Sequence, residues 1–313
     1  MIYTHVMQFF SDETIFPSVF YSNQFFNLIT FSGFVFCFGY VSQLAYYRKP
    51  FKQVYKRMIL NGLKTLVAFY ISGVAFCVYV DGLPLNLNTI LPIIILEVIP
   101  GWSEFLVSFS LFTLLGLVLF NVINWLTDRP TLFWVVCLSL LATTFIDYSA
   151  ITISQLGLLI GTSMFPTFPV IQYLPYYLIG IYFAKHRIDF HRKYLLASIV
   201  GTAIFVCYLF IHEFKHLPER FPPSLYWIIG ATFILYIYYI FSKLLDRIGF
   251  DLRLLSMIGE NVLFYLLLSN ILIFSIDHAI GIHLIIGPIK GILLSFVLIL
   301  VITYLIRIVR VSN

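Results

Sequence analysis

Long apolar runs, separated by short polar or basic segments, dominate the chain. A membrane-crossing helix needs about 20 mainly apolar residues, and nine runs come close to or exceed that length. They lie at residues 25–47, 58–80, 102–126, 131–151, 166–184, 194–211, 224–243, 254–276 and 284–310. The pattern predicts an all-α fold, a polytopic transmembrane helical bundle with nine full spans, formed by a single domain over residues 1–313.

The first ten residues, MIYTHVMQFF, form another apolar run, only half as long as a span requires. Two interpretations are open: an N-terminal half-helix at the outer side of the membrane, and a short segment lying at the interface. A secretory signal peptide is disfavoured, because the run has neither a basic start nor a small-residue cleavage site.

Basic residues gather in alternate loops between the predicted spans. Cytoplasmic loops of membrane proteins are enriched in Lys and Arg, so the loops at 48–57 and 185–193 are predicted to be cytoplasmic, and those at 81–100 and 212–223 to lie outside. This topology places the C-terminus in the cytoplasm of a multi-pass protein of the cell membrane. Four of the 19 basic residues depart from the pattern: Lys64, Lys215, Arg220 and Lys290.

Composition excludes several classes of protein. Hydrophobic residues make up 61% and charged residues 11%, against roughly 45–50% and 25% in soluble domains, so no soluble fold could bury the apolar surface. The net charge of +5 is explained by the loops and does not indicate a nucleic-acid partner. The four cysteines are isolated within apolar runs, which predicts neither a metal site nor a redox centre.

Two ionisable residues at the predicted outer side are candidates for chemistry. Ionisable groups at membrane depth cost on the order of 2.5–3.5 kcal/mol and are functional candidates by default. His5 could act as a general base toward a hydroxyl group, or it could only hydrogen-bond a neighbouring helix. Glu104 could orient His5 and stabilise its protonated form, or it could be an ordinary interfacial anion.

Further polar residues interrupt the predicted spans. Lys64, about two helical turns after Arg57, can extend its side chain to the cytoplasmic surface. Glu260 and Asn261 are predicted to form hydrogen bonds between helices, and Ser269 and Asn270 continue this polar content deeper into the membrane. Small residues at Ser32, Gly33 and Gly39 predict a close approach between two helices.

Four stretches together resemble the acyltransferase 3 family of integral-membrane O-acyltransferases, including its glucan-modifying relatives. His5 followed by Phe25–Phe36 is similar to the first-helix histidine and the F-x-x-S-G-F span of that family. The segment Phe51–Ile59 is similar to its basic loop, and Gln172–Gly180 to its L-P-x-F-x-x-G helix entry. Pro222–Leu225 and the later Ile258–Tyr265 are similar to its P-P-S-L and G-x-N-S-L-x-x-Y elements.

The resemblance implies a ten-helix core and transfer of an acyl group, acetyl or succinyl, from acyl-CoA to a hydroxyl of a cell-surface or periplasmic glycan. It implies His5 as the general base and Glu104 as its electrostatic partner. Lys56, Arg57 and Lys64 would form a cytoplasmic patch that meets the phosphates of the donor, with no cofactor bound. Ser269 and Asn270 stand where family members often have a histidine, and the arginine that precedes the family's histidine would lie before Met1.

The expected partners are thus an acyl donor, a glycan acceptor and membrane lipid, and the sequence gives no oligomeric state. The alternative is a transporter or flippase for lipid-linked saccharide, which would also use many helices, a few buried polar groups and an aromatic lining. The sequence shows neither an internal repeat nor the paired broken helices typical of such transporters.

Overall fold

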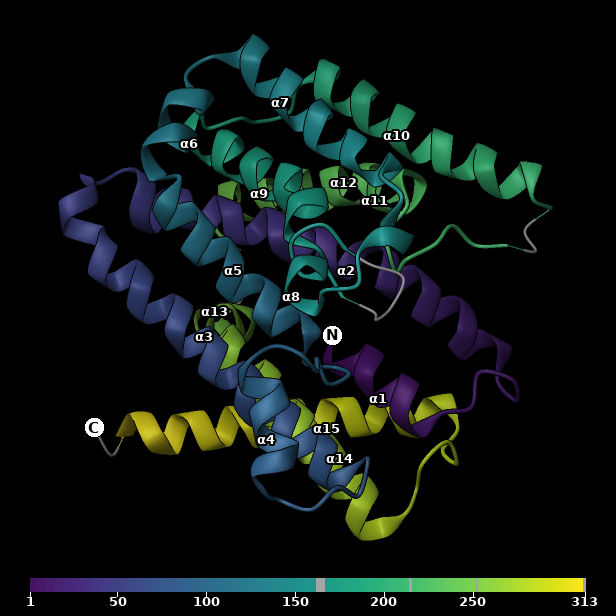
Figure 1. Cartoon of the computed structure of the whole chain (residues 1–313). Helices are drawn as coiled ribbons and strands as arrows, with labels where there is room; N and C mark the ends of the chain where they lie inside the picture. The colour runs from purple at the N-terminus through teal and green to yellow at the C-terminus, as the bar shows by residue number, and fades with distance from the viewer. Residues whose placement is uncertain (162–166, 214–215, 251–252, 312–313) are drawn as a thin grey trace. The chain divides into compact units, whose positions relative to one another are not determined.

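The computed structural model describes residues 1–161, 167–213, 216–250 and 253–311, and these form helices and connecting loops without a strand (Figure 1). Lys215, one of the four basic residues outside the topological pattern, lies outside the described residues. The α-helices are α1 Ile2–Phe10, α2 Pro17–Ser42, α3 Phe51–Tyr79, α4 Leu87–Ile94, α5 Glu104–Val118, α6 Phe120–Thr127, α7 Pro130–Ala142, α8 Ser154–Gly157, α9 Val170–Lys185, α10 Arg192–Ile211, α11 Leu225–Gly230, α12 Thr232–Arg247, α13 Arg253–Glu260, α14 Val262–Ile280 and α15 Pro288–Val311.

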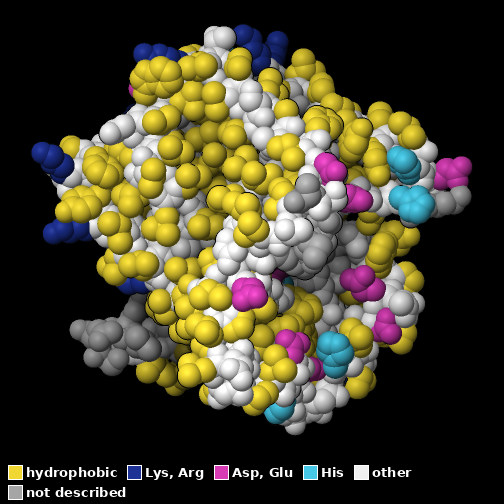
Figure 2. Space-filling view, viewed as in Figure 1, with side chains coloured by type: hydrophobic (Ala, Val, Ile, Leu, Met, Phe, Trp, Pro, Cys, Tyr) yellow, Lys and Arg dark blue, Asp and Glu magenta, His cyan; other side chains and the backbone are white. Residues whose placement is uncertain are grey.

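Six helical segments in the described part of the chain are long and apolar enough to cross a membrane. They are Pro17–Tyr47, Phe51–Tyr79, Arg192–Ile211, Leu225–Arg247, Val262–Ile280 and Pro288–Ile308. In α10 only 6% of the most apolar stretch is buried, and hydrophobic side chains cover much of the face shown in Figure 2. An apolar surface of this extent suits lipid rather than water, which agrees with a multi-pass membrane protein.

Three of the nine predicted spans are shorter or bent in the structure. The run at 102–126 forms α5 and α6, which meet at an angle of 79°. In the run at 131–151, the helix ends at Phe145. The run at 166–184 forms helix α9, which is 16 residues long. The described residues therefore hold six continuous helices that could span a membrane, or seven if the bent pair counts as one, and the predicted count of nine is not confirmed.

The chain divides into two compact units. The first unit comprises Met1–Asn27, Val67–Ser103 and Asp251–Asn313, and the second comprises Leu28–Leu66 and Glu104–Phe250. The boundary between Asn27 and Leu28 falls inside the long helix α2, and that between Leu66 and Val67 falls inside the long helix α3. Hydropathy alone therefore gives no sign of these two boundaries.

Helix α1 packs against α14 and α15 within the first unit, and Figure 1 shows it alongside α15. Val6, Phe9 and Phe10 are fully buried against Phe274 and Leu298. A nine-residue helix is marginal on its own, so this apolar packing stabilises it. The burial favours the interpretation of residues 1–10 as part of the helical bundle over a segment lying at the interface.

Helices α2 and α9 of the second unit cross with their backbones in contact. A methyl group added at Gly39 would lie 2.0 Å from the Tyr177 carbonyl oxygen, and one added at Gly180 would lie 2.1 Å from the Phe36 carbonyl oxygen. Neither position can hold a larger residue without separating the helices. The close approach predicted from the small residues of 32–39 is thus confirmed at Gly39.

Candidate functional site

His5 lies in the middle of α1 with only 8% of its surface exposed. Its Nδ1 is 2.9 Å from Oδ1 of Asn270, a fully buried residue in the middle of α14. The packing of α1 against α14 brings the two side chains together, although 265 positions separate them in the sequence.

The hydrogen bonds of Asn270 determine which nitrogen of His5 carries the proton. The Asn270 side chain lies 2.8 Å from the carbonyl oxygen of Trp102, and a carbonyl can only accept, so the atom facing it is the Nδ2 donor. The Asn270 Oδ1 acceptor therefore faces His5, and Nδ1 of His5 must donate to it. The neutral imidazole then carries its lone pair on Nε2, which is the nitrogen that can accept a proton.

A second layer of polar groups holds Asn270 in place. Its Nδ2 also donates to Ser72 Oγ at 3.0 Å, and Ser103 Oγ donates to the same oxygen at 2.9 Å. Ser72 and Ser103 are fully buried, so the network is shielded from solvent. Its hydrogen bonds join α1, α3, α14 and the segment before α5.

Trp102 contributes its backbone to this network in an unusual conformation. Its φ angle is 56°, in the left-handed region that costs a non-glycine residue on the order of 1–3 kcal/mol. Its indole Nε1 donates to Gln8 Oε1 on α1 at 3.2 Å, while its carbonyl accepts from Asn270. The contacts at both ends hold Trp102 in this conformation, and such strain is often found at functional sites.

Glu104 begins α5 and belongs to the second unit, whereas His5 belongs to the first. The charged neighbour of Glu104 in the second unit is Arg220, in the loop before α11. Burial lowers the pKa of the Arg220 guanidinium from its ordinary value of 12.5, while the nearby Glu104 and Tyr173 act in the opposite direction. An arginine remains charged under these conditions.

The three predicted donor-binding residues, Lys56, Arg57 and Lys64, all lie exposed on α3. They belong to the second unit, whereas the network around His5 belongs to the first.

The predicted structural polar residues have different surroundings. Ser32 is buried in α2 and contacts the Tyr176 hydroxyl. Glu260 is exposed at the end of α13, and Asn261 lies in the break before α14, where its Nδ2 donates to the Met257 carbonyl 2.7 Å away. The described bond of Asn261 is thus local to that break.

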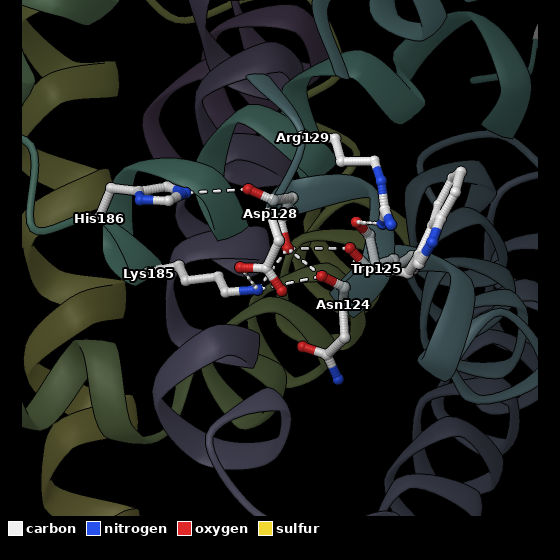
Figure 3. A network of polar contacts seen from close by, with 8 residues as sticks. Asn124, Trp125, Asp128, Arg129, Lys185 and His186 are labelled. Atoms are coloured by element: carbon white, nitrogen blue, oxygen red, sulfur yellow. Dashed lines mark hydrogen bonds and ion pairs between the residues drawn. The ribbon is translucent and has the colours of Figure 1, made fainter. Parts of the chain in front are cut away.

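A second polar network, at the C-terminal end of α6, was not singled out by sequence. Lys185 Nζ lies 2.8 Å from Asp128 Oδ1 and donates to the Asn124 carbonyl and to Thr127 Oγ1 (Figure 3). His186 Nε2 approaches the Thr127 carbonyl at 2.9 Å. The sequence features that could have indicated this network are a basic residue in the last turn of α9 and an acidic residue just after α6.

Three other residues were not identified as site candidates from the sequence. Ser72 and Trp102 sit in apolar surroundings and carry no charge, so nothing in the pattern marks them. Arg220 did carry a signal, because it is a basic residue on the predicted outer side. No group of three or more metal-ligating side chains occurs among the described residues.

In comparisons with known proteins, no family model, no curated protein and no solved structure matches the chain.

Proposed function

We propose that the protein is a membrane-bound O-acyltransferase that moves an acyl group from acyl-CoA to a hydroxyl of a cell-surface or periplasmic glycan. The observation that carries the proposal is the buried contact between His5 and Asn270, which fixes the imidazole as the Nδ1–H tautomer. Such a histidine is prepared to accept a proton at Nε2. The resemblance of the four sequence stretches to acyltransferases supplies the reaction class.

In the proposed reaction, the glycan hydroxyl oxygen attacks the thioester carbonyl while its proton moves to Nε2 of His5. The carbon–sulfur bond then breaks, the thiolate takes the proton from Nε2, and an ester and free coenzyme A result. Asn270 touches neither reactant and serves as a positioning residue. Its Oδ1 keeps the bond to Nδ1–H throughout, so the imidazolium retains a hydrogen-bond acceptor at the moment it is charged.

The donor side of the proposal rests on Lys56, Arg57 and Lys64. All three are exposed on α3, and Lys and Arg side chains bind phosphate through charge-assisted hydrogen bonds. The proposed topology, with a ten-helix core, a location in the cell membrane and a cytoplasmic C-terminus, places this patch on the side where acyl-CoA is found.

Mass spectrometry of surface glycans from cells expressing each variant tests the proposal. We expect His5→Ala and His5→Gln to reduce acylation by roughly 10²–10⁴-fold at equal protein abundance. Gln can still donate to Asn270 but cannot act as a base, so it separates the two roles of His5. The matched control is His278→Ala, an exposed histidine at the end of α14, which should leave acylation unchanged. Normal acylation with His5→Gln would refute the proposed role.

Transport of a lipid-linked saccharide is a second candidate, favoured by one observation. Helices α5 and α6 meet at a 79° bend, as in a broken span or a re-entrant loop, and discontinuous helices are common at transporter substrate sites. In that case the acyl content of the glycan would not change when the gene is deleted. The amount of glycan that reaches the surface would fall instead.

A further inference from the structure

Arg220 is a partly buried cation that the proposed reaction does not use. Its guanidinium carbon lies 4.6 Å from the centre of the Phe221 ring and 5.3 Å from that of Phe168. Its Nε is buried and has no hydrogen-bond partner among the described residues. Buried polar groups are nearly always hydrogen-bonded, and an exception calls for an explanation such as a bound group.

The side chains described around Arg220 are mainly aromatic and make further contacts of their own. The Phe168 ring stacks on Phe31 with 3.9 Å between ring centres, and the Phe168 carbonyl accepts a hydrogen bond from Ser108 Oγ at 2.7 Å. A planar guanidinium can stack on rings while its edge points to an acceptor. The two phenylalanines therefore leave the donor edge of Arg220 as the part that can bind a ligand.

The donor geometry of Arg220 favours a carboxylate ligand over a neutral one. Glu104 lies close enough to attract the Arg220 charge, but the Nε donor remains without an acceptor. A carboxylate offers two parallel acceptors that match the guanidinium edge. A neutral acetyl group offers a single weak acceptor and would leave part of that edge unsatisfied.

We infer that Arg220, between Phe168 and Phe221, anchors a subsite for a carboxylate group. Two sources share this chemistry: the free carboxylate of a dicarboxylic acyl group such as succinyl, and an acidic sugar of the glycan acceptor. The assignment of the carboxylate to a substrate rests on the proposed acyl transfer, whereas anion binding at Arg220 does not.

Isothermal titration calorimetry on the purified full chain in detergent tests the inference with two probes, succinate and glucuronate. Their neutral counterparts, succinamide and glucose, serve as ligand controls. We expect at least one acid to bind and its affinity to fall by roughly ten- to a hundredfold in Arg220→Gln, as expected for hydrogen bonds to a charged group. Arg220→Lys keeps the charge but loses the planar edge, so a loss of several-fold is expected there too.

The matched control is Arg129→Gln. Arg129 also stacks on an aromatic ring, with 4.1 Å to the centre of Trp125, but it is exposed and outside this site. The Arg129→Gln variant should bind both acids with the same affinity as the unmodified protein. Thermal unfolding of each variant shows whether it is folded, and Arg220→Lys decides the question if Arg220→Gln does not fold.

The two probes separate the sources of the carboxylate. Binding of succinate alone supports the acyl group, and binding of glucuronate alone supports the acceptor. Failure of both acids to bind, or binding that is unchanged in the Arg220 variants, overturns the inference. If no acylation of any glycan is found while an acid still binds through Arg220, the proposed function fails and the anion subsite stands.

Discussion

The two units each contain a polar network, and the networks differ in charge and burial. In the first unit, the network of His5, Asn270 and Ser72 contains no ion pair, and these residues are at most 8% exposed. In the second unit, Lys185 and Asp128 form an ion pair in which the Asp128 side chain is 61% exposed (Figure 3). One network is buried and holds no ion pair, and the other contains an ion pair that is partly open to solvent.

Local helix geometry accounts for the second network but not for the first. The last carbonyl groups of any helix lack partners within that helix, and Lys185 and His186 supply donors to the end of α6. His5 and Asn270 lie in the middle of their helices, where the backbone is already satisfied. Burying them in apolar surroundings costs free energy with no capping role in return, and this contrast makes the first network the functional candidate.

Among the variants that compare the two networks beyond His5 itself, Asn270→Leu is expected to have the largest effect. The variant removes the bonds to His5, Ser72 and the Trp102 carbonyl. We expect glycan acylation to fall by about 10²-fold, because His5 loses its fixed tautomer as a general base. Mass spectrometry at equal protein abundance measures the change, and Ser269→Ala on the same helix is the control. Unchanged acylation in Asn270→Leu would remove the functional distinction between the networks.

Lys185→Met should affect stability without affecting chemistry. The variant leaves the Asn124 carbonyl and Thr127 Oγ1 without the Lys185 donor, which should cost about 1–2 kcal/mol of unfolding free energy. Thermal unfolding in detergent and the acylation assay together check this prediction. A loss of acylation at normal protein abundance would show that the charged network is also functional.

Ser72→Ala tests how far the first network depends on its second layer. Asn270 keeps its bond to the Trp102 carbonyl but loses one acceptor, and Ser103 loses the partner of its hydroxyl. The expected cost is about 1 kcal/mol, with a smaller loss of acylation than in Asn270→Leu. An effect as large as that of Asn270→Leu would place the essential contact at Ser72 instead.

The smallest effect is expected from Asp128→Asn. Exposed ion pairs contribute roughly 0–1 kcal/mol, and Lys185 keeps its two other acceptors in this variant. Thermal unfolding should change little at any salt concentration. A clear destabilisation that disappears in high salt would mean that the ion pair contributes more than its exposure suggests.

The sequence predicted the helical class and most of the long spans, because apolar runs of about 20 residues leave few alternatives. It could not predict the bend between α5 and α6. Residues 102–126 are apolar almost throughout, and hydropathy does not show in which direction a helix runs. The division into two units was equally hidden, because its boundaries pass through the apolar helices α2 and α3.

The candidate site was predicted in part. His5 was identified because an ionisable group within an apolar run is costly, and its alternative role, a hydrogen bond to a neighbouring helix, is present as the contact with Asn270. The partners could not be assigned, because Trp102 reaches Asn270 through a backbone carbonyl in a left-handed conformation. A carbonyl is present in every residue, so no side-chain pattern reveals it.

The central claim, that Asn270 holds His5 as the Nδ1–H tautomer, is tested most directly by nitrogen NMR of the protein with ¹⁵N-labelled histidine. The chain has seven histidines, and the His5 signals are those lost in His5→Gln. We predict that neutral His5 shows a protonated Nδ1 and an unprotonated Nε2, and that Asn270→Leu abolishes this preference. A proton on Nε2 in the unmodified protein would contradict the account, because the nitrogen proposed to accept the hydroxyl proton would already carry one.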